Sequence, residues 1–265
     1  MKGRFDDVWE YVRNNIERET IGQSLYGEEI EAFGSSEPQT VIVAGVHARE
    51  FASLKLAFGI LESIISSKVA LPVAVIPVLN PDGLKIVEFG ADAAPEKYRD
   101  LIASIGNFAK WKANGRGVDL NVNFDAEWGC GKQNVKVASF SDYIGEYPFS
   151  EPESRAVKDY LDATRPREVW AFHSRGEVVY HGFGNVLQEK EASRVASLFG
   201  YPFARSLGSA GGLKDWYVLS HGSDGYAVTV ELGPDGKDYA AIADDEKYMQ
   251  KLQNRVYGYL ISDYL

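Results

Sequence analysis

One stretch of ten residues, VIVAGVHARE at positions 41–50, constrains the fold more than any other. Its first part is a short apolar run rich in β-branched residues, which is typical of a buried strand. The run leads into His47 and Glu50, and open α/β sheets bind their ligands beyond the carboxyl ends of the strands. An imidazole and a carboxylate together suit a cation such as zinc, whereas a hydrogen-bonded strand end is the alternative explanation for His47.

Charge and composition exclude several functional classes. The 28 Lys and Arg residues against 38 Asp and Glu give a net charge of -10. This balance argues against binding to a nucleic-acid backbone or to an anionic membrane surface. Cys130 is the only cysteine, so an intrachain disulfide and a thiolate zinc cluster are both excluded. Any metal must therefore use histidine and carboxylate ligands.

The sequence favours one soluble domain. The N-terminal residues lack the apolar core of a secretory signal, and no apolar run is long enough to span a bilayer. We therefore expect a cytoplasmic protein, unless a leader has been removed. No repeat, low-complexity tract or linker divides the sequence, so we expect residues 1–265 to form a single catalytic domain. The sequence does not determine the oligomeric state.

Hydrophobic periodicity predicts a strand, a helix and a second strand in the first third of the chain. Apolar residues between positions 51 and 65 recur at intervals of three and four, which predicts a helix packed on the sheet. Residues 73–79 form a second buried run, closed by a turn signal at 80–83. This alternation predicts a parallel strand pair with a right-handed crossover. Residues 89–147 show no clear period and are expected to form irregular loops at a functional site.

Similar signals continue to the C-terminus. Ser150, Pro152 and Glu153 are typical of a helix start, with Ser150 as the N-cap and Glu153 closing a capping box, and this helix should run to about residue 163. The apolar runs 169–173 and 226–232 predict further strands that carry His173 and Glu231 near their ends. Helices are expected over 8–16 and 248–260, and residues 22–27 indicate an outer strand or hairpin.

Four side chains are thus expected at the ends of three strands: His47, Glu50, His173 and Glu231. Two histidines and one carboxylate, with a fourth position left for water, are the ligand set of a catalytic zinc site. A further glutamate beside such a water can act as a general base, because the metal lowers the pKa of the water toward neutrality. The pattern therefore predicts a hydrolytic zinc centre.

Six short motifs span almost the whole chain: HARE at 47–50, NPDG at 80–83, Trp111 followed by GVDLN at 117–121, FSEPE at 149–153, FHS at 172–174 and TVEL at 229–232. In this order they resemble the zinc carboxypeptidases of the carboxypeptidase A superfamily. The resemblance implies a single-domain α/β fold with a mixed, twisted sheet of about eight strands and helices on both faces. It also implies His47, Glu50 and His173 as zinc ligands and Glu231 as the catalytic glutamate.

The sequence departs from this family where the substrate's terminal carboxylate is bound. The family places an arginine after Asn121, but this chain has Val122, which cannot offer a bidentate fork to a carboxylate. A tyrosine that covers the substrate in the family is replaced by Leu207. The arginine expected to stabilise the oxyanion is Lys112, which keeps the charge. Arg49 is retained as a second candidate for that role, and both Arg49 and Asn121 are expected to bind substrate.

One branch of the family resembles the chain more closely. The segments HSRGE at 173–177 and GGLKDW at 211–216 are similar to those of bacterial γ-D-glutamyl-diamino acid peptidases, which cut cell-wall peptides. In that case Arg175, Glu177 and Lys214 are expected to meet the charges of a diaminopimelate residue, although ordinary loop charges would look the same. We therefore expect a zinc amidohydrolase that acts on small muropeptides. The alternatives are a conventional carboxypeptidase, in which another cation such as Arg175 grips the carboxylate, and a catalytically silent binding module.

Overall fold

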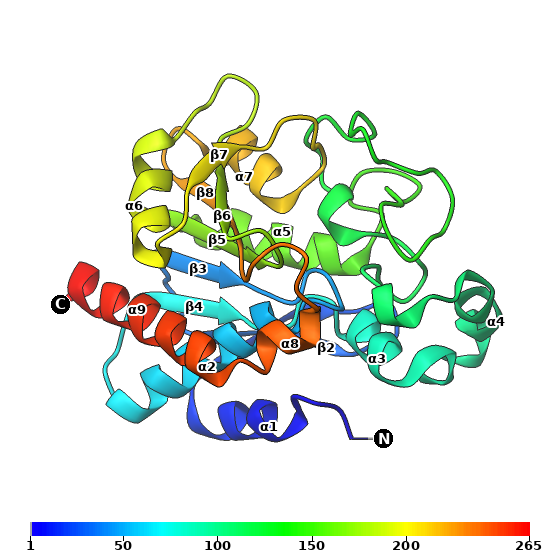
Figure 1. Cartoon of the computed structure of the whole chain (residues 1–265), viewed down its shortest axis with the longest axis horizontal. Coiled ribbons are helices and arrows are strands. Elements are labelled where there is room, and N and C mark those ends of the chain that lie inside the picture. Colours follow the sequence, from blue (N-terminus) through cyan, green and yellow to red (C-terminus); the bar gives the residue numbers. More distant parts are fainter. Residues whose placement is uncertain (1) are drawn as a thin grey trace.

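The computed structural model describes residues 2–265, and in this range eight strands form one mixed sheet in the order β1-β2-β4-β3-β5-β8-β6-β7 (Figure 1). This confirms the predicted fold class. The strands are β1 (Arg18–Gln23), β2 (Glu29–Gly34), β3 (Thr40–Val43), β4 (Val73–Ile76), β5 (Glu168–His173), β6 (Val178–His181), β7 (Phe203–Arg205) and β8 (Tyr226–Glu231). The α-helices are α1 (Asp6–Asn15), α2 (Phe51–Ser67), α3 (Pro81–Phe89), α4 (Glu96–Ile105), α5 (Pro152–Thr164), α6 (Glu189–Phe199), α7 (Leu213–His221), α8 (Tyr239–Ala243) and α9 (Glu246–Tyr264).

The centre of the sheet is parallel and buried on both faces. Strands β4, β3, β5 and β8 run parallel to their neighbours in that order, which confirms the parallel pairing predicted for β3 and β4. Successive residues of β3 point to opposite faces, so Ile42 joins one apolar cluster while Val41 and Val43 join the other. A strand covered on both faces has no need of alternating polar residues, which explains its continuous apolar sequence.

Helices cover both faces of the sheet (Figure 1). On one face, α1, α2, α6 and α9 contribute to the larger apolar cluster. On the other face, α5 and α7 contribute to the second cluster, with Val157 and Leu161 from α5 and Leu213 and Trp216 from α7. A third, smaller cluster lies under α3 and α4. In residues 2–265 no helix combines the length and the apolar character needed to cross a membrane.

The strand order places a functional crevice beside β3. The chain passes from β3 through α2 to β4 on one side of β3, while β5 pairs with its other side. Ligands of α/β proteins bind beyond the carboxyl ends of the strands at such a reversal of strand order. His47 follows β3 and His173 ends β5, so both lie at this crevice.

Several local predictions were wrong. Residues 80–83 do not close the strand with a simple turn: they start α3, and the side chain of Asn80 caps it by accepting a hydrogen bond from the Gly83 amide. Glu151, not Ser150, is the N-cap residue of α5, and the capping box does not form because Glu153 accepts a hydrogen bond from the distant Leu25 amide instead. The segment 89–147 is not wholly irregular, since it contains α4.

Candidate metal centre and active site

Three predicted metal ligands converge in the structure. Nδ1 of His47 lies 2.8 Å from Oε1 of Glu50, and Nδ1 of His173 lies 3.1 Å from Oε2 of the same carboxylate. The two Nδ1 atoms are 3.1 Å apart. All three side chains are buried, and one ligand atom from each lies within 4.8 Å of the others. Two imidazoles and a carboxylate whose donor atoms meet at one point fit a zinc ion with an open fourth position.

A buried carboxylate orients the first of these ligands. Asp119 is fully buried, and its Oδ1 atom lies 3.1 Å from Nε2 of His47. A carboxylate on the far ring nitrogen fixes the tautomer of a histidine, so Nδ1 of His47 is left free to bind a metal. Burial alone would raise the pKa of Asp119, but the positive charges of Lys112 and His47 hold it well below its usual range. Asp119 is therefore ionised and able to accept this bond.

No sequence pattern predicts a role for Asp119. Its carboxylate also accepts hydrogen bonds from the backbone amides of Asn121, at 3.0 Å, and Asp142, at 3.1 Å. The only sequence signal for it was its place inside the GVDLN motif. The contact between Asp119 and His47 joins residues 72 positions apart, and neither periodicity nor spacing reveals such a contact.

The proposed catalytic glutamate lies beside the ligand cluster. Glu231 ends β8, directly opposite His173 in the β5–β8 pairing. Because paired residues on neighbouring strands point to the same side, the β-sheet itself presents Glu231 next to His173, a predicted metal ligand. Burial and then the negative charge of Glu50 raise the pKa of Glu231 above its ordinary value. A bound dication would counter the charge of Glu50 and favour the carboxylate form needed in a base.

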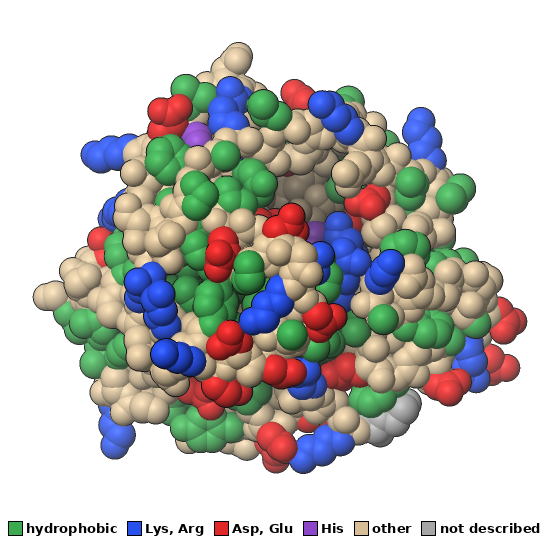
Figure 2. All heavy atoms as spheres, viewed as in Figure 1, with side chains coloured by type: hydrophobic (Ala, Val, Ile, Leu, Met, Phe, Trp, Pro, Cys, Tyr) green, Lys and Arg blue, Asp and Glu red, His purple; other side chains and the backbone are tan. Residues whose placement is uncertain are grey.

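A cavity of about 390 Å³ opens beside this cluster. Figure 2 shows a hollow on this face of the molecule, with a histidine at its floor and side chains of both charges at its rim. Five predicted site residues line the cavity: His47, Lys112, Asn121, Lys214 and Glu231. Val122 and Leu207 line it as well, so all three departures from the family pattern, these two and Lys112, lie where substrate would bind.

The cavity holds lysines whose charges are paired. Nζ of Lys112 lies 3.2 Å from Asp119 and 3.5 Å from Asp142. Burial lowers the pKa of Lys112, but Asp119 and Asp142 more than offset this and raise it, so the ammonium stays charged. Deeper in the protein, Nζ of Lys214 lies 2.5 Å from Oδ1 of Asp215, and both side chains are buried. Nζ of Lys214 also donates a hydrogen bond to the Gly182 carbonyl.

The other predicted site residues lie outside this cavity. Arg49 and Arg175 both contact the ring of Tyr239. Glu177 lies near the hydroxyl of Tyr248: burial raises the pKa of that phenol, and the charge of Glu177 adds to the effect. The structure thus separates Arg175 and Glu177 from Lys214, with which they had been grouped.

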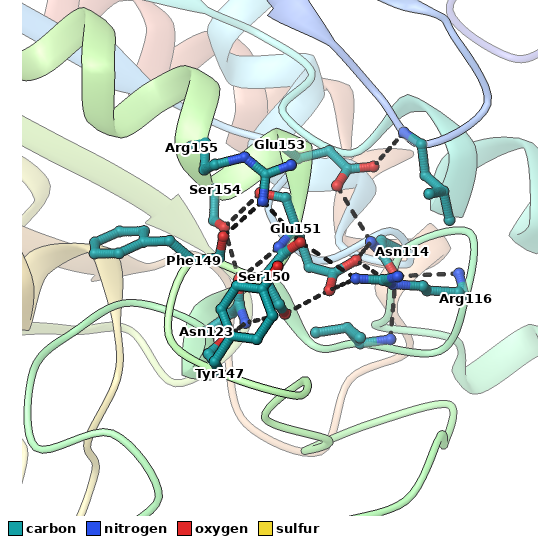
Figure 3. Close-up of polar contacts among 12 residues, drawn as sticks. Asn114, Arg116, Asn123, Tyr147, Phe149, Ser150, Glu151, Glu153, Ser154 and Arg155 are labelled. Carbon is teal, nitrogen blue, oxygen red and sulfur yellow. Dashed lines mark hydrogen bonds and ion pairs between the residues drawn. The ribbon is translucent and has the colours of Figure 1, made fainter.

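A buried polar network holds the loop that carries Lys112 and Asp119 (Figure 3). Nδ2 of Asn114 donates to Glu151 at 2.7 Å and to Glu153 at 3.2 Å. Arg116 adds two hydrogen bonds to the carboxylate of Glu151. These contacts tie the loop to the N-terminus of α5, and charge-assisted hydrogen bonds in a buried setting are strong enough to fix its path.

Comparison with known proteins places this site in a family. The profile of the zinc carboxypeptidase family matches residues 4–209. The chain belongs to this family. The match contains His47, Glu50 and His173 and ends before Glu231. Family membership agrees with the donor set: zinc is the metal that two histidines and one carboxylate with an open position would hold.

Individual relatives extend the comparison. The chain is 37% identical to gamma-D-glutamyl-L-diamino acid endopeptidase 1 of Lysinibacillus sphaericus over 168 residues, which is 60% of this chain and 42% of that protein. It is 25% identical to carboxypeptidase B of Astacus astacus over 251 residues, which is 82% of this chain and 79% of that protein. The chain spans less than half the length of the first of these relatives.

Solved structures of low sequence identity share the fold. Bovine thrombin-activatable fibrinolysis inhibitor in complex with tick carboxypeptidase inhibitor superposes with a TM-score of 0.72 at 22% identity, covering 98% of this chain and 95% of that one. Murein-tripeptide amidase MpaA from Escherichia coli gives a TM-score of 0.60 at 23% identity, covering 91% of each chain. At these identities the likeness establishes the architecture and not the substrate.

Proposed function

We propose that this chain is a zinc amidohydrolase that cleaves the bond between a γ-linked D-glutamyl residue and a diamino acid in small cell-wall peptides. The observation that carries the proposal is the charge pattern of the cavity. Val122 leaves no guanidinium for a terminal carboxylate at that position, while a buried cation and a buried anion, Lys214 and Asp215, lie together in the wall. The second amino acid centre of diaminopimelate carries both an ammonium and a carboxylate, and it complements such a pair.

A relative supports the same substrate class. The protein from Lysinibacillus sphaericus that is 37% identical over 168 residues is named a gamma-D-glutamyl-L-diamino acid endopeptidase. The matched region covers 60% of this chain. As part of the proposal, we assign to this chain the substrate that the name of that protein states, a bond between a γ-D-glutamyl residue and a diamino acid.

The side chains present supply the steps of a hydrolysis. A zinc ion held by His47, Glu50 and His173 would lower the pKa of a water molecule and polarise the scissile carbonyl. Glu231 accepts the proton of the attacking water and passes it to the leaving amine. The ammonium of Lys112 stabilises the negative charge that develops on the carbonyl oxygen. Because the pKa of Lys112 is raised by Asp119 and Asp142, it stays cationic throughout the neutral range.

A substrate panel tests the proposal. Losing a buried charge-assisted pair costs about 2–5 kcal/mol, a factor of about 10 to 1000 or more, so the valine at position 122 should make simple peptides poor substrates. We expect kcat/KM for L-Ala-γ-D-Glu-meso-diaminopimelate to exceed that for peptides ending in Phe, Leu, Lys or Arg. Higher values for the simple peptides would instead identify a conventional carboxypeptidase with another carboxylate-binding residue.

A further inference from the structure

Two arginines lie beside the metal-ligand cluster and outside the cavity. Arg49 directly precedes the ligand Glu50, and Arg175 lies two residues after His173. The guanidinium carbon of Arg49 lies 4.6 Å from the ring centroid of Tyr239, and that of Arg175 lies 4.8 Å from the same centroid. Both cations are thus held against one aromatic ring, and together they form a single cationic patch beside the site.

Most of the donors in this patch are unused. Nη1 of Arg49 donates to the Lys110 carbonyl at 2.8 Å, and Nη1 of Arg175 donates to the Lys237 carbonyl at 2.6 Å. Within residues 2–265 these are the only hydrogen bonds of either guanidinium, although each carries five N–H groups. The nearest carboxylate is that of Asp235, 3.5 Å from Nε of Arg175; it is 89% exposed, so its pairing is weak.

The cationic patch lies where the acyl half of a substrate would bind. In the proposed function the cavity takes the leaving diamino acid, so the acyl half must lie outside the cavity, beside the metal-ligand cluster. Arg49 lies with Glu50 in the connection between β3 and α2, and Arg175 lies just beyond β5, which ends at His173. The backbone of an ordinary peptide near the scissile bond is neutral, so it offers carbonyl oxygens but no charged partner to two arginines.

We infer that Arg49 and Arg175 bind a carboxylate on the acyl side of the scissile bond, namely the free α-carboxylate that a γ-linked glutamyl residue keeps. This inference rests on the proposed function. Three carbons join that carboxylate to the scissile carbonyl, a reach of up to about 5 Å given ordinary carbon–carbon bond lengths. Planar guanidinium groups suit a carboxylate, and stacking on Tyr239 holds them in place before substrate arrives. Arg175 then recognises the glutamyl residue and not the diamino acid.

A matched pair of substrates tests the inference. L-Ala-γ-D-Glu-meso-diaminopimelate carries the α-carboxylate, and its D-isoglutamine analogue carries a neutral carboxamide at the same atom. We expect the zinc-loaded protein to prefer the acid by about 10-fold or more in kcat/KM. Arg175→Gln should reduce this preference to about 3-fold or less. Arg255→Gln is the control, since Arg255 also donates to a backbone carbonyl but lies on α9, and it should keep the full preference.

The outcomes separate this inference from the proposed function. Equal cleavage of acid and amide by the unmodified protein would overturn the inference and leave the γ-glutamyl activity standing. A proportional loss on both substrates in Arg175→Gln, with the preference unchanged, would also overturn it, because the arginine would then only hold the segment around Lys237. Failure to cleave either tripeptide would refute both proposals. Arg175→Lys provides a folded variant that keeps the charge without the fork, and it should retain part of the preference.

Discussion

Replacing Asp119 by asparagine should weaken zinc binding although Asp119 is not a metal ligand. The carboxylate lies 3.1 Å from Nε2 of His47 and 3.2 Å from Nζ of Lys112, and it accepts two backbone amides. An asparagine oxygen can still accept one of these bonds, but its NH₂ group faces donors on the other side, and the negative charge that makes His47 a better ligand is lost. Changes to partners of metal-bound histidines typically reduce metal affinity about 10- to 100-fold, or about 1.4–2.7 kcal/mol.

The measurement is a competition titration of the metal-free protein with zinc and a chromogenic chelator. Asp142→Asn is the matched control, because Asp142 is the other carboxylate near Lys112, at 3.5 Å, and forms no hydrogen bond with His47 among the residues described. We expect a weaker zinc Kd for Asp119→Asn and an unchanged one for Asp142→Asn. The Tm of each metal-free variant, measured by thermal unfolding, shows whether the substitution has impaired folding. Equal zinc affinity of Asp119→Asn and the unmodified protein would refute this role of Asp119.

Four further predictions follow from the geometry. Elemental analysis should find zinc in the unmodified protein and lose it in His173→Ala; full retention by the variant would remove His173 from the ligand set. Glu231→Gln should keep the zinc but lose several orders of magnitude in kcat, and normal turnover would make Glu231 merely structural. Burial and then the charge of Asp82 raise the pKa of Glu153 from 4.5 to about 8. Between pH 4.5 and about 8, the carboxyl of Glu153 therefore keeps its proton in the folded state and loses it in the unfolded state. The free energy of unfolding should therefore fall as the pH rises from 4.5 to about 8, by up to about 1.4 kcal/mol per pH unit. Chemical denaturation at several pH values should show a smaller fall for Glu153→Gln, and an equal fall in the variant would contradict this. Finally, a tripeptide with L-lysine in third position, which lacks the carboxylate that Lys214 would meet, should be cleaved about 10-fold or more slowly than the diaminopimelate form, and equal rates would argue against that contact.

The sequence predicted the central part of the fold because that part is governed by local patterns. The buried strands β3, β4, β5 and β8 appear as short apolar runs, and α2 and α9 appear as periodic ones. Strand β6 and the edge strand β7 were missed. β7 has only three residues, all of them exposed, so burial leaves no pattern in its sequence.

The site was predicted in part for a similar reason. His47, Glu50, His173 and Glu231 all lie at or just beyond the ends of recognisable strands, where chemistry is expected in an α/β fold. Asp119 and Asp215 were missed because their roles depend on contacts made only after folding. Arg175 and Lys214 could be named as charges near the site, but only the structure separates the cation in the cavity from the one stacked on Tyr239. Sequence spacing gives no information about such a separation.

The most direct test of the γ-glutamyl proposal compares two isomers of one tripeptide. L-Ala-D-Glu-meso-diaminopimelate can be joined through the γ- or the α-carboxyl of glutamate, so the isomers have the same mass, charge and leaving group. Both are offered to the zinc-loaded protein in one tube, and chromatography with mass spectrometry follows their loss, so that the ratio of initial rates gives the ratio of kcat/KM. We predict that the γ-linked isomer is consumed at least about 10-fold faster, because only this isomer keeps the free α-carboxylate of glutamate in the position proposed for it on the acyl side of the scissile bond. Equal consumption, or faster loss of the α-linked isomer, would contradict the proposed function.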